Sequence, residues 1–220
     1  LSDAELDMLI AENSCDEAEI LWGKVAERRA EVLMINPSMD VSGVKMPKMP
    51  DMISSREMSG VYLNEILRAG YPLIGGSADL GGSTNVRVGA SVDILPGVFD
   101  GNYINYGVRE HAMAGIMNGV ASVGLRPYGS TFLVFSDYMR PAMRLSALSK
   151  LPVIYVLTHD SVVVGEDGPT HQPIEQLASL RLMPNMNVFR PCNADEVAVA
   201  WQMALRDNNS PSAIVLSRQK

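Results

Sequence analysis

Residues 151–157 form an uninterrupted apolar run, LPVIYVL, and a polar segment rich in glycine and proline, THDSVVVGEDGPTHQP, follows it at once. A run of this length and composition predicts a strand buried on both faces, as in the parallel sheets of α/β proteins. Ligand sites in such proteins lie at the carboxyl ends of the strands. The segment 158–173, which contains His159 and His171, is therefore predicted to belong to a site.

The rest of the compact region alternates between strand patterns and helix patterns. Strands are predicted at 73–76, 103–106, 126–130, 152–157, 187–190 and 212–216, and helices at 56–69, from 110 onward, at 136–150, after Pro173 and up to 206 from a cap at Asn193. This alternation predicts an α/β fold with a doubly wound, mostly parallel sheet of five or six strands and helices on both faces.

The amino-terminal quarter is expected to lie outside this domain. Two capping-box patterns predict two short helices within residues 1–34, and the three prolines of 35–52 predict an extended connector. We therefore expect a helical arm and a Pro/Met-rich linker over 1–53, and a compact domain over 54–220.

Charge and composition exclude several classes of protein. Nine acidic residues against three basic ones give 1–34 a charge of −6, so the body is nearly neutral and has no basic stripe for nucleic acid. No run approaches the ~20 apolar residues of a membrane span, and the acidic start lacks a signal-peptide pattern. Cys15 and Cys192 stand far apart, which favours reduced thiols in a cytoplasmic protein without a zinc site.

Glu110 follows one predicted strand and opens a helix. The helix dipole stabilises a carboxylate there by about 0.3–1 kcal/mol, so an ordinary helix-start glutamate is one interpretation. The other is a carboxyl that exchanges a proton with a bound heterocycle. The residues themselves leave both open.

An aromatic stripe follows another strand, with Phe132, Phe135 and Tyr138 spaced i, i+3, i+6. Core packing is the ordinary interpretation, and a flat wall for a ring is the alternative. His159 alone is equally typical of a satisfied core histidine, but His171 twelve residues later in an acid-rich turn favours a polar substrate pocket. A metal site is a weaker alternative, because no compact ligand spacing is present.

Two arginines, Arg56 and Arg218, could bind phosphate through their guanidinium groups, although a solvated surface position is the default for each. The chain has no glycine-rich phosphate loop of the Walker or dinucleotide type. The segment SADLGGST at 77–84 is rich in glycine, but its spacing fits neither type.

Taken together, the segments GGSADL, YGVREHAM, FLVFSDY, THDSVVVGEDGPTHQPIEQLASLR, PNMNVFRP and LSRQ resemble transketolase, in the right order from residue 56 to 220. The resemblance is to the central, pyrimidine-binding domain of that thiamine diphosphate-dependent family. It implies transfer of a two-carbon ketol unit between sugar phosphates of the pentose phosphate pathway. The family's amino-terminal domain, which binds the diphosphate and a divalent metal (magnesium or calcium), and its carboxyl-terminal domain are absent from this sequence.

The resemblance also implies roles for individual residues. Glu110 would hydrogen-bond the ring nitrogen of the aminopyrimidine, where a shared proton favours the imino tautomer. Catalytic roles fall to Glu110, His159 and His171. Cofactor contacts fall to Asp79, Leu80, Glu110, Phe132, Phe135 and Tyr138. Substrate contacts fall to Arg56, Ser83, His159, Asp167, His171 and Arg218. None of these residues is expected to bind metal.

Two positions depart from the family pattern. Gly81 and Gly82 stand where the family usually has threonine and proline, so we expect a looser loop and a weaker phosphate contact by Ser83. Glu57 stands beside Arg56 where a second basic residue is common, which lowers the local positive charge.

A chain with one half of a cofactor site needs a partner. We expect it to bind thiamine diphosphate weakly or not at all alone, to pair with a diphosphate-binding domain or subunit, and to self-associate through an apolar patch. Dihydroxyacetone synthase shares these motifs and deoxyxylulose-phosphate synthase some of them. A non-catalytic docking or regulatory subunit and a plain nucleotide-binding protein remain alternatives from other classes.

Overall fold

A computed structural model describes residues 38–220, and the helical arm expected over 1–34 lies outside these residues. Six strands form one sheet in the order β2-β1-β3-β4-β6-β5, and every neighbouring pair is parallel. The strands are β1 (Leu73–Ser77), β2 (Tyr103–Asn105), β3 (Arg126–Phe132), β4 (Ile154–Thr158), β5 (Asn187–Phe189) and β6 (Ser212–Leu216). The predicted α/β class with its largely parallel sheet is confirmed.

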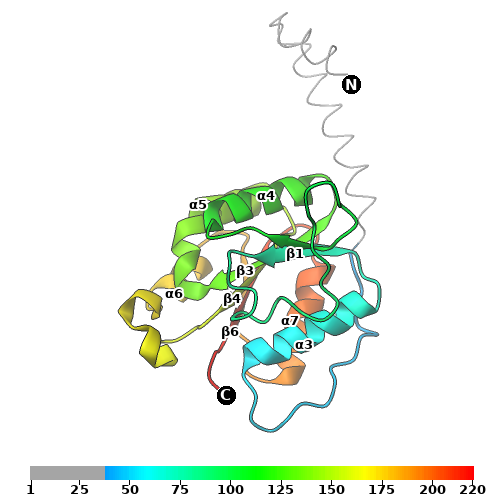
Figure 1. Ribbon diagram of the computed structural model, residues 1–220. Coiled ribbons are helices and arrows are strands. Elements are labelled where there is room, and N and C mark those ends of the chain that lie inside the picture. Colours follow the sequence, from blue (N-terminus) through cyan, green and yellow to red (C-terminus); the bar gives the residue numbers. More distant parts are fainter. Residues whose placement is uncertain (1–37) are drawn as a thin grey trace, which may run out of the picture. The chain divides into compact units, whose positions relative to one another are not determined.

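Helices cover both faces of the sheet (Figure 1). One face carries α3 (Ser55–Arg68) and α7 (Ala194–Arg206), and the other carries α4 (Glu110–Ser122), α5 (Ser136–Leu148) and α6 (Gln176–Arg181). β4 alternates between the two cores: Ile154 and Val156 pack with α3 and α7, and Tyr155 and Leu157 pack with α4 and α5. Burial on both faces explains why this strand has a continuous apolar sequence.

Two helices begin at residues with capping side chains, of which the sequence predicts Asn193. Ser54 caps α3 through a complete capping box with Glu57, and the Asn193 side chain accepts a hydrogen bond from the Glu196 N–H at the start of α7. The segment 38–53 forms no helix or strand, and Met39 and Val41 pack into the core that α3 and α7 share. The domain boundary at 54 stays a prediction.

Arg126, at the start of β3, is 1% exposed and ties three elements together. Its Nη1 donates to the carbonyl oxygens of Asp207 (2.8 Å), Pro152 (3.4 Å) and Ala204 (3.4 Å), and its Nη2 donates to Oδ1 of Asn208. Burial lowers the pKa of Arg126 to about 10, with the Asp207 charge opposing the shift, so the guanidinium stays charged at neutral pH.

The last strand in sequence is not at the edge of the sheet. β6 pairs with β4 on one side and with β5 on the other. The strand order reverses between β1 and β3, because the chain leaves β1 toward β2 and leaves β3 toward β4. Such a reversal is the point at which open α/β sheets bind ligands, outside the carboxyl ends of the strands.

Candidate functional site

The carboxylate of Glu110 lies at this reversal point. Glu110 is the first residue of α4, directly after β2 and its short loop, and it is only 8% exposed. Thr131 of β3, fully buried, donates its hydroxyl to Oε1 of Glu110 over 3.4 Å. Because this hydrogen bond is single and long, the carboxylate can still accept hydrogen bonds from a ligand. The start of the helix also stabilises its negative charge.

Aromatic and imidazole rings form one continuous cluster that begins at Phe132, the residue after Thr131. Phe132 at the end of β3 stacks on Phe135 with centroids 5.7 Å apart, and Phe135 contacts Tyr138 at 6.0 Å. His159 stacks on Phe132 at 3.7 Å, and His171 meets Phe135 edge-on at 5.0 Å. Two histidines and three aromatic residues that the sequence spreads over forty positions therefore share one wall.

His159 has a strained backbone in this wall. Its φ of 62° lies in the left-handed region, where a residue other than glycine costs about 1–3 kcal/mol. The residue is 2% exposed, and its Nδ1 lies 2.7 Å from the hydroxyl of Thr158. This contact occupies Nδ1 and leaves Nε2 available to a ligand.

The charge state of His159 follows from its surroundings. Burial lowers its pKa to about 4, and the charges of Arg56 and Arg218 contribute to the shift, while Asp167 opposes it. The ring is therefore neutral at physiological pH. The same interactions show that both arginines lie close enough to act electrostatically on the ring.

We expect stability to fall as the pH is lowered from about 6.5 to about 4. In this window the unfolded chain protonates residue 159 and the folded chain does not, so protons favour unfolding. Urea unfolding followed by circular dichroism at several pH values measures the effect. His159→Asn, whose side chain tolerates positive φ, should flatten the dependence, whereas His111→Asn, at an exposed histidine of α4, should leave it unchanged. An identical pH dependence in wild type and His159→Asn would contradict the assignment.

The two predicted phosphate-binding arginines are neighbours across α3 and β6. The Arg56 N–H donates to the carbonyl of Ser217 (3.3 Å), the residue before Arg218. The Arg56 Nη1 donates to the carbonyl of Ser83 (2.5 Å). Its Nε is buried and has no hydrogen-bond partner among the described residues. The structure thus brings Arg56, Ser83 and Arg218 to the same corner of the site.

Backbone hydrogen bonds and close packing hold the loop after β1 at Gly81. The N–H groups of Val86 and Arg87 both donate to the carbonyl of Gly81 (3.1 and 3.3 Å). A Cβ at Gly81 would lie 2.3 Å from the hydroxyl of Tyr103, so close packing requires glycine there. Glycine at 81 therefore permits contact with β2, and the looser loop with a weaker phosphate contact by Ser83 stays a prediction.

Asp79 and Leu80 lie within this loop. Leu80 donates its N–H to the Ser77 hydroxyl (3.1 Å), which anchors the turn on β1. Asp79 has a φ of 62° and lines a polar hollow of about 210 Å³ with Arg87 and Asn105. No ring contact or hydrogen bond joins Asp79 to the aromatic cluster in the part of the chain that the structure describes.

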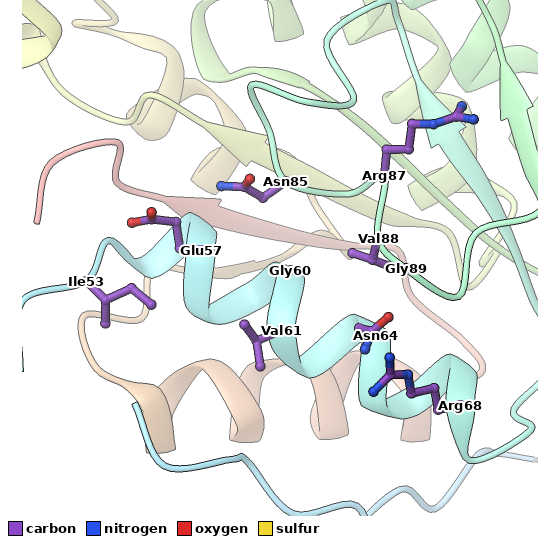
Figure 2. Close-up of a pocket in the computed structure, with 10 residues that line it drawn as sticks. All are labelled: Ile53, Glu57, Gly60, Val61, Asn64, Arg68, Asn85, Arg87, Val88 and Gly89. Carbon is purple, nitrogen blue, oxygen red and sulfur yellow. The ribbon is translucent and has the colours of Figure 1, made fainter. Parts of the chain in front are cut away.

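A larger hollow of about 490 Å³ lies between α3 and residues 85–89 (Figure 2). It is lined by side chains such as Val61, Asn64 and Arg68, and none of the predicted site residues contributes to it. Over residues 38–220 no three His, Cys, Asp or Glu side chains converge as metal ligands would. None of the helices in the same range combines the length and apolarity needed to cross a bilayer.

Sequence reasoning missed Arg190. Its guanidinium pairs with the Asp160 carboxylate at 2.8 Å, and the Asp160 side chain is 9% exposed. This pair holds the residue directly after the strained His159. Arg190 follows β5, so the rule that directed attention to the ends of the other strands would also have found it.

An apolar surface adjoins the site. Large apolar side chains are exposed on α5 at Tyr138, Leu145 and Leu148, on α4 at Ile116, and directly after α4 at Val123. Figure 1 shows α4 and α5 side by side on one face of the sheet. Several exposed apolar side chains on neighbouring helices are typical of a protein interface.

Comparison with known proteins identifies similar sequences. The family model described as "Transketolase, pyrimidine binding domain" matches residues 51–220. A transketolase of Sinorhizobium medicae is 56% identical over 168 residues, which is 76% of this chain and 24% of that protein. A transketolase of Cereibacter sphaeroides is 48% identical over 191 residues, covering 86% of this chain and 29% of that protein. The chain thus spans about a quarter of the length of these relatives.

Solved structures agree with the sequence comparison. Transketolase from Leishmania mexicana superposes with a TM-score of 0.79 at 41% identity, covering 93% of this chain and 32% of that one. A structure described as a split gene transketolase, inactive beta4 tetramer, has a TM-score of 0.60 at 30% identity, covering 76% of this chain and 52% of that one.

Proposed function

Because this chain belongs to the transketolase family through its pyrimidine-binding domain, we propose that it supplies the aminopyrimidine half of a thiamine diphosphate site. The complete enzyme would move a two-carbon ketol unit between sugar phosphates. The observation that carries this proposal is the nearly buried carboxylate of Glu110, which is hydrogen-bonded to Thr131 at the start of the ring cluster Phe132, Phe135 and Tyr138.

The residues present fit an aminopyrimidine. A flat heterocycle with ring nitrogens needs aromatic contact and a carboxyl that can share a proton, and both lie at the carboxyl edge of β2 and β3. Thiamine diphosphate, when bound, supplies a nucleophilic carbon for attack on a ketose carbonyl. Glu110 would hold a proton at the ring nitrogen, the aromatic rings would orient the heterocycle, and Asp79 and Leu80 would complete its boundary.

The remaining residues would hold the sugar phosphate. The Nε2 of neutral His159 and the half-exposed ring of His171 would contact substrate hydroxyls, and Asp167 would distinguish the configuration of a hydroxyl. Arg56, Ser83 and Arg218 would grip the phosphate. Their shared corner, the mutual repulsion of the two arginines and the unpartnered Nε of Arg56 support an anion there.

Other parts of the complete site would come from elsewhere. We propose that a diphosphate-binding domain or subunit holds magnesium or calcium and the diphosphate, because no metal-ligand cluster occurs within residues 38–220. The apolar surface of α4 and α5 would dock on that partner or on a second copy of this chain, giving a dimer in the cytoplasm. A relative described as a split gene transketolase supports separate subunits.

Isothermal titration tests this proposal directly. We expect the isolated chain to bind thiamine diphosphate with magnesium weakly or not at all, and a mixture with a diphosphate-binding transketolase subunit to bind it tightly and turn over. Light scattering on the same mixture checks that the two proteins assemble. Tight binding by the isolated chain, or an assembled complex that binds no cofactor, would overturn the division of the site.

A further inference from the structure

The guanidinium group of Arg218, one of the two arginines proposed to bind phosphate, is already paired with a carboxylate. The Nη2 of Arg218 donates to Oε1 of Glu166 over 2.6 Å, and its Nη1 donates to the carbonyl of Val164 over 3.1 Å. The Glu166 side chain is 76% exposed and that of Arg218 only 32%. The carboxylate therefore reaches the guanidinium from its solvent side, which is the side from which a substrate would arrive.

Arg56 and Arg218 place two positive charges in one corner. Burial lowers the pKa of Arg56, the charge of Glu57 raises it, and the charge of Arg218 lowers it further, so the two guanidinium groups repel each other. Glu57, beside Arg56, is engaged by the backbone N–H and hydroxyl of Ser54 (3.0 and 2.6 Å). Among the described residues, Glu166 is the one acid whose carboxylate contacts either guanidinium.

The exposed Glu166 side chain lies between two glycines, in a turn that other contacts hold in place. Gly165 and Gly168, which flank the Glu166–Asp167 pair, have φ of 74° and 76°, and a Cβ at either would meet open space. The rest of the turn η2 (Val162–Asp167) is held independently, since Gln172 donates to the carbonyl of Val162 (2.8 Å) and Gln219 to that of Val163 (2.5 Å). Release of Glu166 alone would not dissolve the turn.

We propose that Glu166 is an internal counter-anion that substrate phosphate displaces from Arg218, and that it thereby limits the preference for phosphorylated over unphosphorylated sugars. This inference rests on the proposed function of Arg56 and Arg218. A phosphate dianion carries more charge than a carboxylate and can bridge both guanidinium groups. While Glu166 is paired with Arg218, the site binds weaker anions less tightly. A phosphate must then either displace the carboxylate or bind beside its negative charge.

Neutralising Glu166 should therefore tighten phosphate binding. For Glu166→Gln we expect the Kd for inorganic phosphate to fall about two- to fivefold at low ionic strength, the range of an exposed ion pair, and less at high salt. The probe is the full chain titrated with inorganic phosphate, with the arginine Nε–Hε signals followed by NMR. In the complex with a diphosphate-binding subunit, the KM of a phosphorylated ketose should fall likewise. The KM of an unphosphorylated ketose and both kcat values should not change.

Glu65→Gln is the matched control. It removes the same charge from an exposed ion pair with Arg68, 3.5 Å long, and Figure 2 shows Arg68 at the opposite end of α3 from Glu57. Phosphate binding should be unaffected by this change.

The variant Arg218→Ala distinguishes failure of the proposed phosphate site from failure of the role proposed for Glu166. If it leaves phosphate binding unchanged, the proposed phosphate grip itself is wrong. Arg218→Ala could instead weaken phosphate binding while Glu166→Gln binds phosphate no more tightly than wild type. Glu166 is then not a displaced counter-anion, and the proposed phosphate site is retained.

Discussion

Glu110→Gln should lower turnover of the assembled enzyme by about 10²–10⁴-fold, the range of a positioned proton-transfer group. The amide keeps the shape of the carboxyl and can still accept the hydrogen bond from the buried hydroxyl of Thr131. It cannot share a proton with a ring nitrogen in the way a carboxyl does. The fold and the assembly should therefore survive while the chemistry is lost.

The measurement is steady-state turnover of the chain combined with its diphosphate-binding partner, with light scattering to confirm assembly. Glu175→Gln, at an exposed residue before α6, serves as the control for loss of a carboxylate and should retain wild-type turnover. If Glu110→Gln turns over within fivefold of wild type, Glu110 has no role in proton transfer.

Arg126→Met should destabilise the domain by about 3–5 kcal/mol, because several buried carbonyl groups lose their donor together. Methionine fills part of the volume, so the loss reflects polar groups more than a cavity. Arg126→Lys should be intermediate, since an ammonium group cannot reach all these acceptors in one fork.

Urea unfolding followed by circular dichroism measures this loss. Arg68→Met, which removes a guanidinium that is 64% exposed, should stay within about 0.5 kcal/mol of wild type. A loss of less than about 1 kcal/mol in Arg126→Met would mean that water or neighbouring donors satisfy the freed carbonyls.

The strands and helices could largely be predicted because each carries its own local pattern. The continuous apolar sequence predicts β4, and the cap at Asn193 predicts the start of α7, because both depend only on residues close together in the sequence. β6 begins and ends where the sequence predicts. The family resemblance is confirmed by the model match over residues 51–220.

The turns within 158–173 could not be predicted, because distant residues shape them. Arg218 and Gln219 donate hydrogen bonds to the carbonyls of Val164 and Val163 more than fifty positions away. The same holds for the contact of His159 with Phe132, which joins the ends of two strands. Sequence patterns located the polar edge of the sheet, but the pairing of individual side chains there depends on the folded chain. The roles assigned to these side chains stay predictions.

The place of β6 in the sheet has a consequence for biosynthesis. A ribosome delivers residues in order, so β5 emerges before β6, the strand that joins it to β4. The strands that carry the acid and the ring cluster, β1 to β4, are contiguous in the sheet and can associate on the nascent chain. Until residues 212–216 have been made, β5 has no strand to pair with, and unpaired strands favour misassembly. Arg218 follows β6 in the sequence, so the anion-binding corner can form only after that strand has been made.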